Sequence, residues 1–116
     1  MKPTTEQPVI RDVVLDARFA SVKATSRVEV RRIRMLPGHA GGLHVHNTPV
    51  VGSIVAGSVV YQIEGSPAEV LRAGDVFFEP QDVRIARFDA LEDGVEFLGY
   101  FLIGDGEQAS LSVPED

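Results

Sequence analysis

Glycine and proline interrupt this chain at short intervals. From Pro37 to Gly104 a break comes about every 8 to 12 residues, which is typical of many short strands. The segments between the breaks are rich in valine, isoleucine, phenylalanine and tyrosine, which fit a pleated sheet. No segment keeps the apolar spacing of a helix over three turns; residues 13–22 come nearest, with small and β-branched residues that form helices poorly. The sequence therefore predicts an all-β protein. The expected strands are 50–55, 59–63, 76–78, 83–88 and 95–103.

The composition excludes several classes of protein. With 116 residues the chain has room for one compact domain and no second core. It contains no cysteine, so thiol nucleophiles, zinc–thiolate sites and disulfides are excluded. No apolar run approaches the length of a membrane span, and the N-terminal segment lacks the pattern of a signal peptide. We therefore expect a cytoplasmic protein with no membrane partner.

Charge is distributed unevenly along the chain. The net charge is −6 and the isoelectric point is near 5.0, which argues against nucleic acid as a partner because such a partner needs a basic surface. Residues 1–63 nevertheless carry +4 and residues 64–116 carry −10, and six basic residues lie between Arg18 and Arg34. These form either a strip that attracts anions or a surface that pairs with the acidic half. The second interpretation is favoured, because a compact domain then needs no outside partner.

The alternation of side chains predicts how two segments face the core. Successive residues of a strand point to opposite faces. In residues 28–35 the apolar side chains change from even to odd positions, which predicts a β-bulge near Arg31 and Arg32. Residues 95–103 are apolar on both faces and should be buried on both. In so small a protein the second buried face indicates contact with another subunit or with a terminal arm, and we expect a homodimer.

One histidine pair is a candidate binding site. His44 and His46 are two residues apart, so on a strand they project from the same face, about 6.6 to 6.8 Å apart. Two imidazoles at that distance can converge on one metal ion or one ligand. They can also hydrogen-bond inside a partly polar barrel, or exchange protons with a ligand near neutral pH. The pair alone does not decide among these roles.

The residues around this pair make it more specific. Gly38, five residues, His44, one residue and His46 are followed by three residues to Val50 and six more to Gly57. This spacing resembles the first motif of the cupin family, Gly-x5-His-x-His-x3-4-Glu-x6-Gly, at four of its five positions.

The second cupin motif, Gly-x5-Pro-x-Gly-x2-His-x3-Asn, is matched at fewer positions. Gly74 and Pro80 have the expected spacing. Asp82, Ile85 and Asp89 stand where glycine, histidine and asparagine are usual.

The resemblance covers residues 28–103 and implies a fold. Small single-domain bacterial cupins form an antiparallel jelly-roll barrel, the double-stranded β-helix, and are commonly dimeric and often metal-dependent. On this basis the chain divides into an N-terminal arm with the first strands at 1–27, a cupin barrel at 28–103 and a C-terminal tail at 104–116.

The departures from the motifs affect the metal site. Cupins that bind a divalent metal use both histidines and the glutamate of the first motif and the histidine of the second, and here the last two positions are Val50 and Ile85. The resemblance therefore implies that His44 and His46 hold Fe, Mn, Ni or Zn weakly, or hold no metal. Three nearby residues are candidate replacement ligands, although each also has an ordinary role in a loop or turn: His39, Glu79 and Asp89.

The interior is expected to form a ligand pocket. Arg87 shares parity with Ile85; facing inward it would bind a carboxylate or phosphate, and at the rim it would pair with an acid. Our first interpretation is a barrel that binds a small polar or anionic organic ligand. The alternative is a metal-dependent oxygenase or isomerase of a small acid, and a third is a filled barrel that binds a partner on its outer surface. Whether the protein is an enzyme stays open. The expected pocket residues are Val50, Ile54, Tyr61, Ile85 and Arg87.

Overall fold

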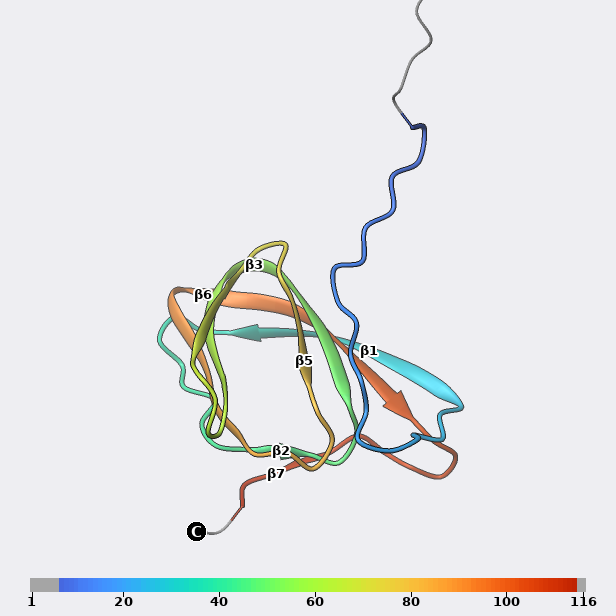
Figure 1. The fold of residues 1–116 in the computed structure, drawn as a ribbon. Helices are drawn as coiled ribbons and strands as arrows, with labels where there is room; N and C mark the ends of the chain where they lie inside the picture. The colour runs from blue at the N-terminus through green and yellow to red at the C-terminus, as the bar shows by residue number, and fades with distance from the viewer. Residues whose placement is uncertain (1–6, 115–116) are drawn as a thin grey trace, which may run out of the picture.

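The structure is a computed structural model that describes residues 7–114, and it is built from strands (Figure 1). It confirms the prediction of an all-β protein. The described part of the chain contains no helix that is long and apolar enough to cross a membrane. The strands are β1 (Arg27–Met35), β2 (Val45–His46), β3 (Val50–Ile63), β4 (Glu69–Arg72), β5 (Val76–Glu79), β6 (Ile85–Ile103) and β7 (Leu111–Ser112).

The strands pair in two antiparallel sheets. The larger sheet has the order β1-β6-β3-β4, and β5 also pairs with β3. The smaller sheet consists of β2 and β7 and closes one side of the barrel (Figure 1). The antiparallel barrel expected from the sequence is therefore confirmed.

Two strands are longer than the sequence predicts, because two glycines bend them instead of ending them. Gly57 lies inside β3 with a φ of 75°, and Gly94 lies inside β6 with a φ of 69°. The register between β3 and β6 shifts on both sides of Gly57. A Cβ atom on Gly57 would lie 2.1 Å from the carbonyl oxygen of Gly94. Only glycine permits this approach, so the two long strands bend together around the barrel.

The bulge predicted near Arg31 and Arg32 is wrong. β1 pairs with β6 in unbroken register from Arg27 opposite Ile103 to Met35 opposite Val95. Instead, the inward face of β1 changes from polar to apolar side chains along the strand. Glu29 and Arg31 face inward ahead of the apolar residues, whereas Val28 and Val30 are about half exposed on the outer face. The parity change in the sequence therefore marks polar residues inside the barrel.

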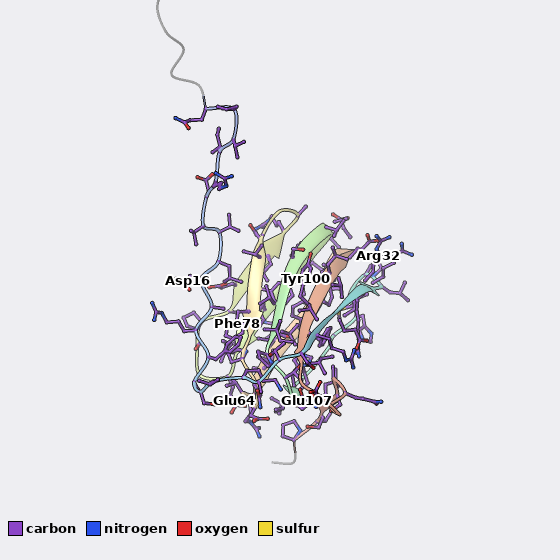
Figure 2. All side chains as sticks on the ribbon, turned by 90° about the vertical axis from the view of Figure 1, so that its right-hand side faces the viewer. Asp16, Arg32, Glu64, Phe78, Tyr100 and Glu107 are labelled. Atoms are coloured by element: carbon purple, nitrogen blue, oxygen red, sulfur yellow. The ribbon has the colours of Figure 1, made fainter. Side chains whose placement is uncertain are left out.

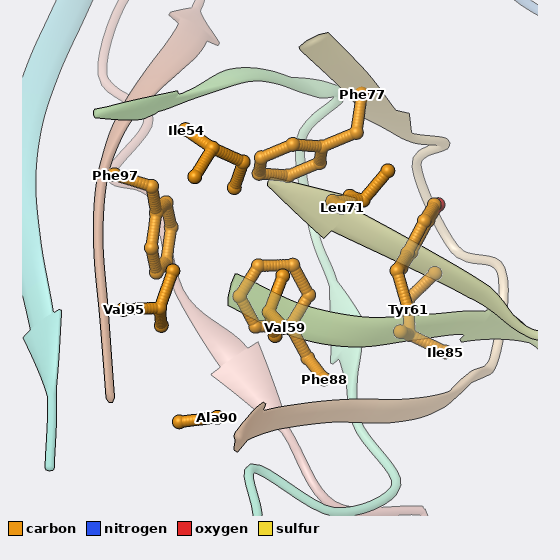
Figure 3. Packing of buried hydrophobic residues seen from close by; sticks show 10 residues of the cluster. All are labelled: Ile54, Val59, Tyr61, Leu71, Phe77, Ile85, Phe88, Ala90, Val95 and Phe97. Carbon is orange, nitrogen blue, oxygen red and sulfur yellow. The ribbon is translucent and has the colours of Figure 1, made fainter. Parts of the chain in front are cut away.

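The core is an aromatic cluster inside the barrel (Figure 3). Its centre is formed by Phe77, Phe88 and Phe97, whose ring centroids lie 4.9 to 5.8 Å apart. Gly52 on β3 makes room for Phe77, since a Cβ atom there would lie 2.1 Å from the ring. The buried cluster comprises Ile54, Val59, Tyr61, Leu71, Phe77, Ile85, Phe88, Ala90, Val95 and Phe97.

The N-terminal segment runs away from the barrel in an extended conformation (Figures 1 and 2). Between residues 7 and 26 it forms no strand. Phe19 stacks on Phe78 of β5 with ring centroids 5.8 Å apart, which ties the segment to the outside of the barrel. At the other terminus, β7 lies within the range expected to be a peripheral tail. The division at residues 27 and 103 itself stays a prediction.

Candidate metal centre and ligand cavity

His44 lies directly before β2, the strand that closes the barrel, and His46 is the last residue of that strand. The backbone of His44 pairs with that of Ile85 through hydrogen bonds of 3.0 and 2.8 Å, and His46 pairs with Leu111. Both histidines are buried, and their rings meet edge to face with centroids 5.0 Å apart. Each imidazole is therefore held by a backbone ladder and directed into the barrel.

A buried carboxylate lies between the two imidazoles. Glu79 is the last residue of β5 and is 5% exposed. Its Oε1 is 3.3 Å from Nε2 of His44, and its Oε2 is 2.7 Å from Nε2 of His46. The carboxylate thus bridges the histidine pair.

Glu79 lies directly across the sheet from the position where the cupin motif has its glutamate. Val50 stands at the motif position, and Val50 and Glu79 are directly opposite each other in the pairing of β3 with β5. Side chains at opposed positions of an antiparallel pair lie close together. The carboxylate that is absent from β3 is therefore supplied by the neighbouring strand.

The hydrogen bonds of His44 require a proton on each of its two ring nitrogens, whereas a neutral imidazole carries only one. Its Nδ1 is 2.9 Å from the carbonyl oxygen of Gly42, which can only accept, so Nδ1 carries the proton and donates it. In a neutral His44, Nε2 then presents a lone pair to a carboxylate of Glu79 that is also only an acceptor. A proton or a metal ion between the two groups resolves this conflict.

Burial and hydrogen bonding oppose each other in setting the pKa values of this cluster. Burial disfavours the charged form of His44, but hydrogen bonds to Glu79 and Gly42 outweigh it and raise the pKa of His44. Burial likewise favours the neutral form of Glu79, yet hydrogen bonds from both histidines lower the pKa of that carboxyl. Positive charge is therefore favoured between the histidines and the carboxylate.

The donor set fits a divalent transition metal. His44, His46 and Glu79 each offer one ligand atom, and all three atoms lie within 4.8 Å of one another. Two imidazoles and one carboxylate form a donor set that zinc and iron sites use. The other candidate ligands are not part of this group: His39 is exposed in its loop, and Asp89 accepts a hydrogen bond from Arg87 at 2.9 Å.

A cavity of about 270 Å³ opens beside the three residues. Its walls are mainly apolar. Its polar side chains are Arg31, Ser110 and the three candidate metal ligands His44, His46 and Glu79. β7 and the residue after it form part of the wall. The apolar lining residues are Ile33, Met35, Val50, Phe88, Phe97, Phe101, Leu111 and Val113.

Of the pocket residues expected from the sequence, one lines the cavity and three belong to the packed core. Val50 lines the cavity. Ile54, Tyr61 and Ile85 belong to the packed aromatic cluster instead. The hydroxyl of Tyr61 donates to the carbonyl oxygen of Phe78, and burial raises the pKa of Tyr61. These three residues fill the barrel next to the cavity.

Arg87 points out of the barrel, so it takes the rim position, the second of its two expected positions, and it does not belong to the pocket. Ile85 lies opposite Ile63, but Arg87 lies opposite the adjacent residue, Gln62, so the register shifts by one at this point. A shift of one residue moves side chains to the other face. Arg87 is therefore exposed and pairs with Asp89. The arginine that does line the cavity is Arg31, near which the sequence had predicted a bulge.

Comparisons with known proteins are informative at the level of structure. No family model matches the sequence, and no curated protein matches it. DMSP lyase DddQ from Ruegeria pomeroyi superposes with a TM-score of 0.66 at 22% identity, over 74% of this chain and 42% of the other. Oxalate oxidase in complex with glycolate superposes with a TM-score of 0.63 at 20% identity, over 74% and 45%. The chain thus spans less than half the length of either enzyme.

A structure of similar size carries the family name. An RmlC-like cupin from Shewanella frigidimarina superposes with a TM-score of 0.58 at 25% identity, over 68% of each chain. A protein with a double-stranded β-helix domain from Klebsiella pneumoniae matches with a TM-score of 0.62 at 19% identity, over 82% of this chain and 81% of that one. With its antiparallel barrel and its His-x-His motif on the closing strand, this chain belongs to the cupin superfamily.

Proposed function

We propose that this protein binds a divalent transition metal through His44, His46 and Glu79 and receives a small organic ligand in the cavity beside it. The observation that carries the proposal is the convergence of three buried donor atoms within 4.8 Å at the wall of a cavity. Three protein ligands leave positions open for water or a ligand oxygen, as in catalytic zinc sites. A bound ion would polarise such an oxygen or acidify a bound water.

The residues of the chain have separate tasks in this proposal. The carbonyl oxygen of Gly42 holds the proton on Nδ1 of His44, which leaves Nε2 free to bind the ion. Glu79 supplies the negative charge that two neutral imidazoles lack. Phe101 packs against the ring of His46, with centroids 6.1 Å apart, and limits the access of water from that side.

Metal analysis of protein purified without chelator or affinity tag tests this proposal. Wild-type protein incubated with Fe, Mn, Ni or Zn and then dialysed should retain about one ion per chain. Glu79→Gln should retain much less, because it keeps the shape but removes the charge. Glu92→Gln, a change at an exposed glutamate, is the matched control and should behave as wild type. Equal metal content in wild type and Glu79→Gln would contradict the proposed ligand set.

The enzyme interpretation is favoured by one observation, the position of the cavity directly against the donor set. In that case the reaction is an oxidation or isomerisation of a small acid. His44, His46 and Glu79 would hold the ion next to a substrate bound in the cavity. Oxygen-consumption and isomerase assays on metal-loaded protein, with Glu79→Gln as the inactive reference, test it. The third interpretation, a filled barrel that binds a partner on its outer surface, is not favoured, because the barrel contains a cavity.

We propose further that two copies associate through the N-terminal segment. Val13, Val14 and Val22 are 72 to 98% exposed, and Val28 and Val30 expose the outer face of β1. Several exposed apolar side chains on one segment and on the strand that follows it are typical of an interaction surface. The segment leaves its own barrel (Figure 1), and a second copy offers the same outer face to receive it.

Light scattering after size-exclusion chromatography tests this association. The wild type should have twice the chain mass of 12.6 kDa. Val13→Glu combined with Val14→Glu should yield monomers, whereas Leu36→Glu, at an exposed leucine outside the segment, should remain dimeric. A monomeric wild type would overturn the proposal. The cytoplasmic location expected from the sequence stays a prediction that cell fractionation would test.

A further inference from the structure

Arg31 is the one arginine or lysine that lines the cavity in the described part of the chain. It lies on the inward face of β1, opposite Gly99 of β6. A Cβ atom on Gly99 would lie 3.0 Å from the ring of Phe101, so this glycine leaves room for the ring. The guanidinium of Arg31 lies over that ring, with Cζ 4.6 Å from the ring centroid. The arginine is therefore held against the wall of the cavity.

The hydrogen bonds of Arg31 leave part of its guanidinium available. Its Nε donates to Oε1 of Glu29 at 2.9 Å. Neither terminal amino group of Arg31 has a hydrogen-bond partner within residues 7–114. Glu29 also accepts from Arg27, so one carboxylate is shared between two guanidinium groups and the trio keeps a net positive charge. An anion at this place would therefore be favoured.

Phe101 connects Arg31 with the metal-binding candidates. One part of its ring meets the imidazole of His46, with centroids 6.1 Å apart, and the guanidinium of Arg31 lies over the same ring. A ligand that is anchored on Arg31 and reaches His46 must therefore lie along Phe101. The adjoining wall is apolar and includes Ile33 and Met35.

We infer that the cavity binds a small carboxylate with an apolar body, and that Arg31 binds its carboxylate group. This inference rests on the proposed function of the same site. Guanidinium donors match a carboxylate in charge and geometry, and the apolar wall excludes a uniformly polar ligand. A cavity of about 270 Å³ lies just below the range of about 300 to 1,000 Å³ that small-molecule pockets span, so a small ligand is expected. The carboxylate end lies at Arg31, and the opposite end lies at the histidines and Glu79.

Benzoate and benzamide form a matched pair of probes, since they have the same size and differ in charge. Calorimetry on protein stripped of metal with EDTA should show that benzoate binds more tightly than benzamide. Arg31→Gln should weaken benzoate binding about 10- to 100-fold, because a charged hydrogen-bond partner is lost, and should leave benzamide binding nearly unchanged. Arg31→Lys should recover only part of the affinity, because it keeps the charge and loses the paired donors.

Arg32→Gln is the matched control, because Arg32 is the next residue of β1, carries the same charge and is exposed on the outer face (Figure 2). It should bind benzoate as the wild type does. Equal benzoate affinity in Arg31→Gln and wild type, equal affinity of the wild type for both probes, or no benzoate binding at millimolar concentration would overturn the inference. Metal content, measured on the same variants, is a separate readout. It should be unchanged in Arg31→Gln, so that failure of the carboxylate site is distinguishable from failure of the metal site.

Discussion

The barrel interior has two parts that differ in packing and chemistry. One is the aromatic cluster around Phe77, where rings fill the space (Figure 3). The other is the cavity, where apolar walls surround three buried polar groups. Phe88 and Phe97 belong to both, since they pack in the cluster and line the cavity. The comparison indicates that the packed part carries most of the stability and that the hollow part is free to bind a ligand.

The largest effect on stability is expected from the packed part. Phe77→Ala should lower the free energy of unfolding by about 3 to 5 kcal/mol, since it removes a buried ring from the centre of the cluster. Phe78→Ala, the adjacent residue on the outer face, should cost clearly less because its ring stacks only on Phe19. Urea unfolding measures both values. Equal losses would show that the cluster does not dominate stability.

A smaller effect is expected from pH, and it should come from the polar part. With metal removed, Glu79 stabilises the fold above pH 4.5, and this contribution is lost as the pH falls through its lowered pKa. His44 stabilises the fold below pH 6.5, and this contribution is lost as the pH rises through its raised pKa. The combined contribution should therefore be greatest between about pH 4.5 and 6.5.

Melting temperatures in EDTA between pH 4 and 9 measure this dependence. The difference between wild type and Glu79→Gln should be largest inside the window and should shrink on either side of it. Glu92→Gln should follow the wild type throughout. A constant difference between wild type and Glu79→Gln at all pH values would show that the pair contributes no pH-dependent stability.

The smallest effect on global stability is expected at the wall formed by β7. The side chain of Asn47 donates to the carbonyl oxygen of Gln108 at 2.8 Å and accepts from the backbone of Ser110 at 2.7 Å. Asn47→Ala should cost about 1 kcal/mol, because these bonds are partly exposed to water. Its main result should be local, with faster hydrogen exchange at residues 108–113. Gln62→Ala, which removes a similar side-chain bond to Ser66, should leave exchange at β7 unchanged.

The site shows how far sequence reasoning extends. The histidine pair and its glycine spacing predicted the fold family and two of the three residues of the candidate metal centre. Glu79 was recognised only as one of three replacement ligands, although a signal was present: Phe77 and Glu79 alternate with Val76 and Phe78, so a buried Phe77 places Glu79 on the same inward face. What the sequence did not contain was the pairing of β5 with β3, which brings Glu79 opposite Val50.

The two arginines show where such reasoning fails. Counting alternate residues left Arg87 open between the pocket and the rim and predicted a bulge near Arg31. In the structure Arg87 lies at the rim, and Arg31 lies on a regular strand and lines the cavity. The register shift occurs between Ile85 and Arg87, and β1 is regular. A single extra residue on one strand exchanges the two faces beyond it, and no local residue preference indicates where that happens.

The class of fold could be predicted from local pattern, because the alternation of strand formers with glycine and proline acts over a few residues and needs no distant contact. The sequence also predicted which imidazoles can act together, because their separation along one strand is local. Which carboxylate joins them, and which arginine lines the cavity, could be read only from the folded barrel. Those choices depend on strand register, which is set by the packing of the whole barrel.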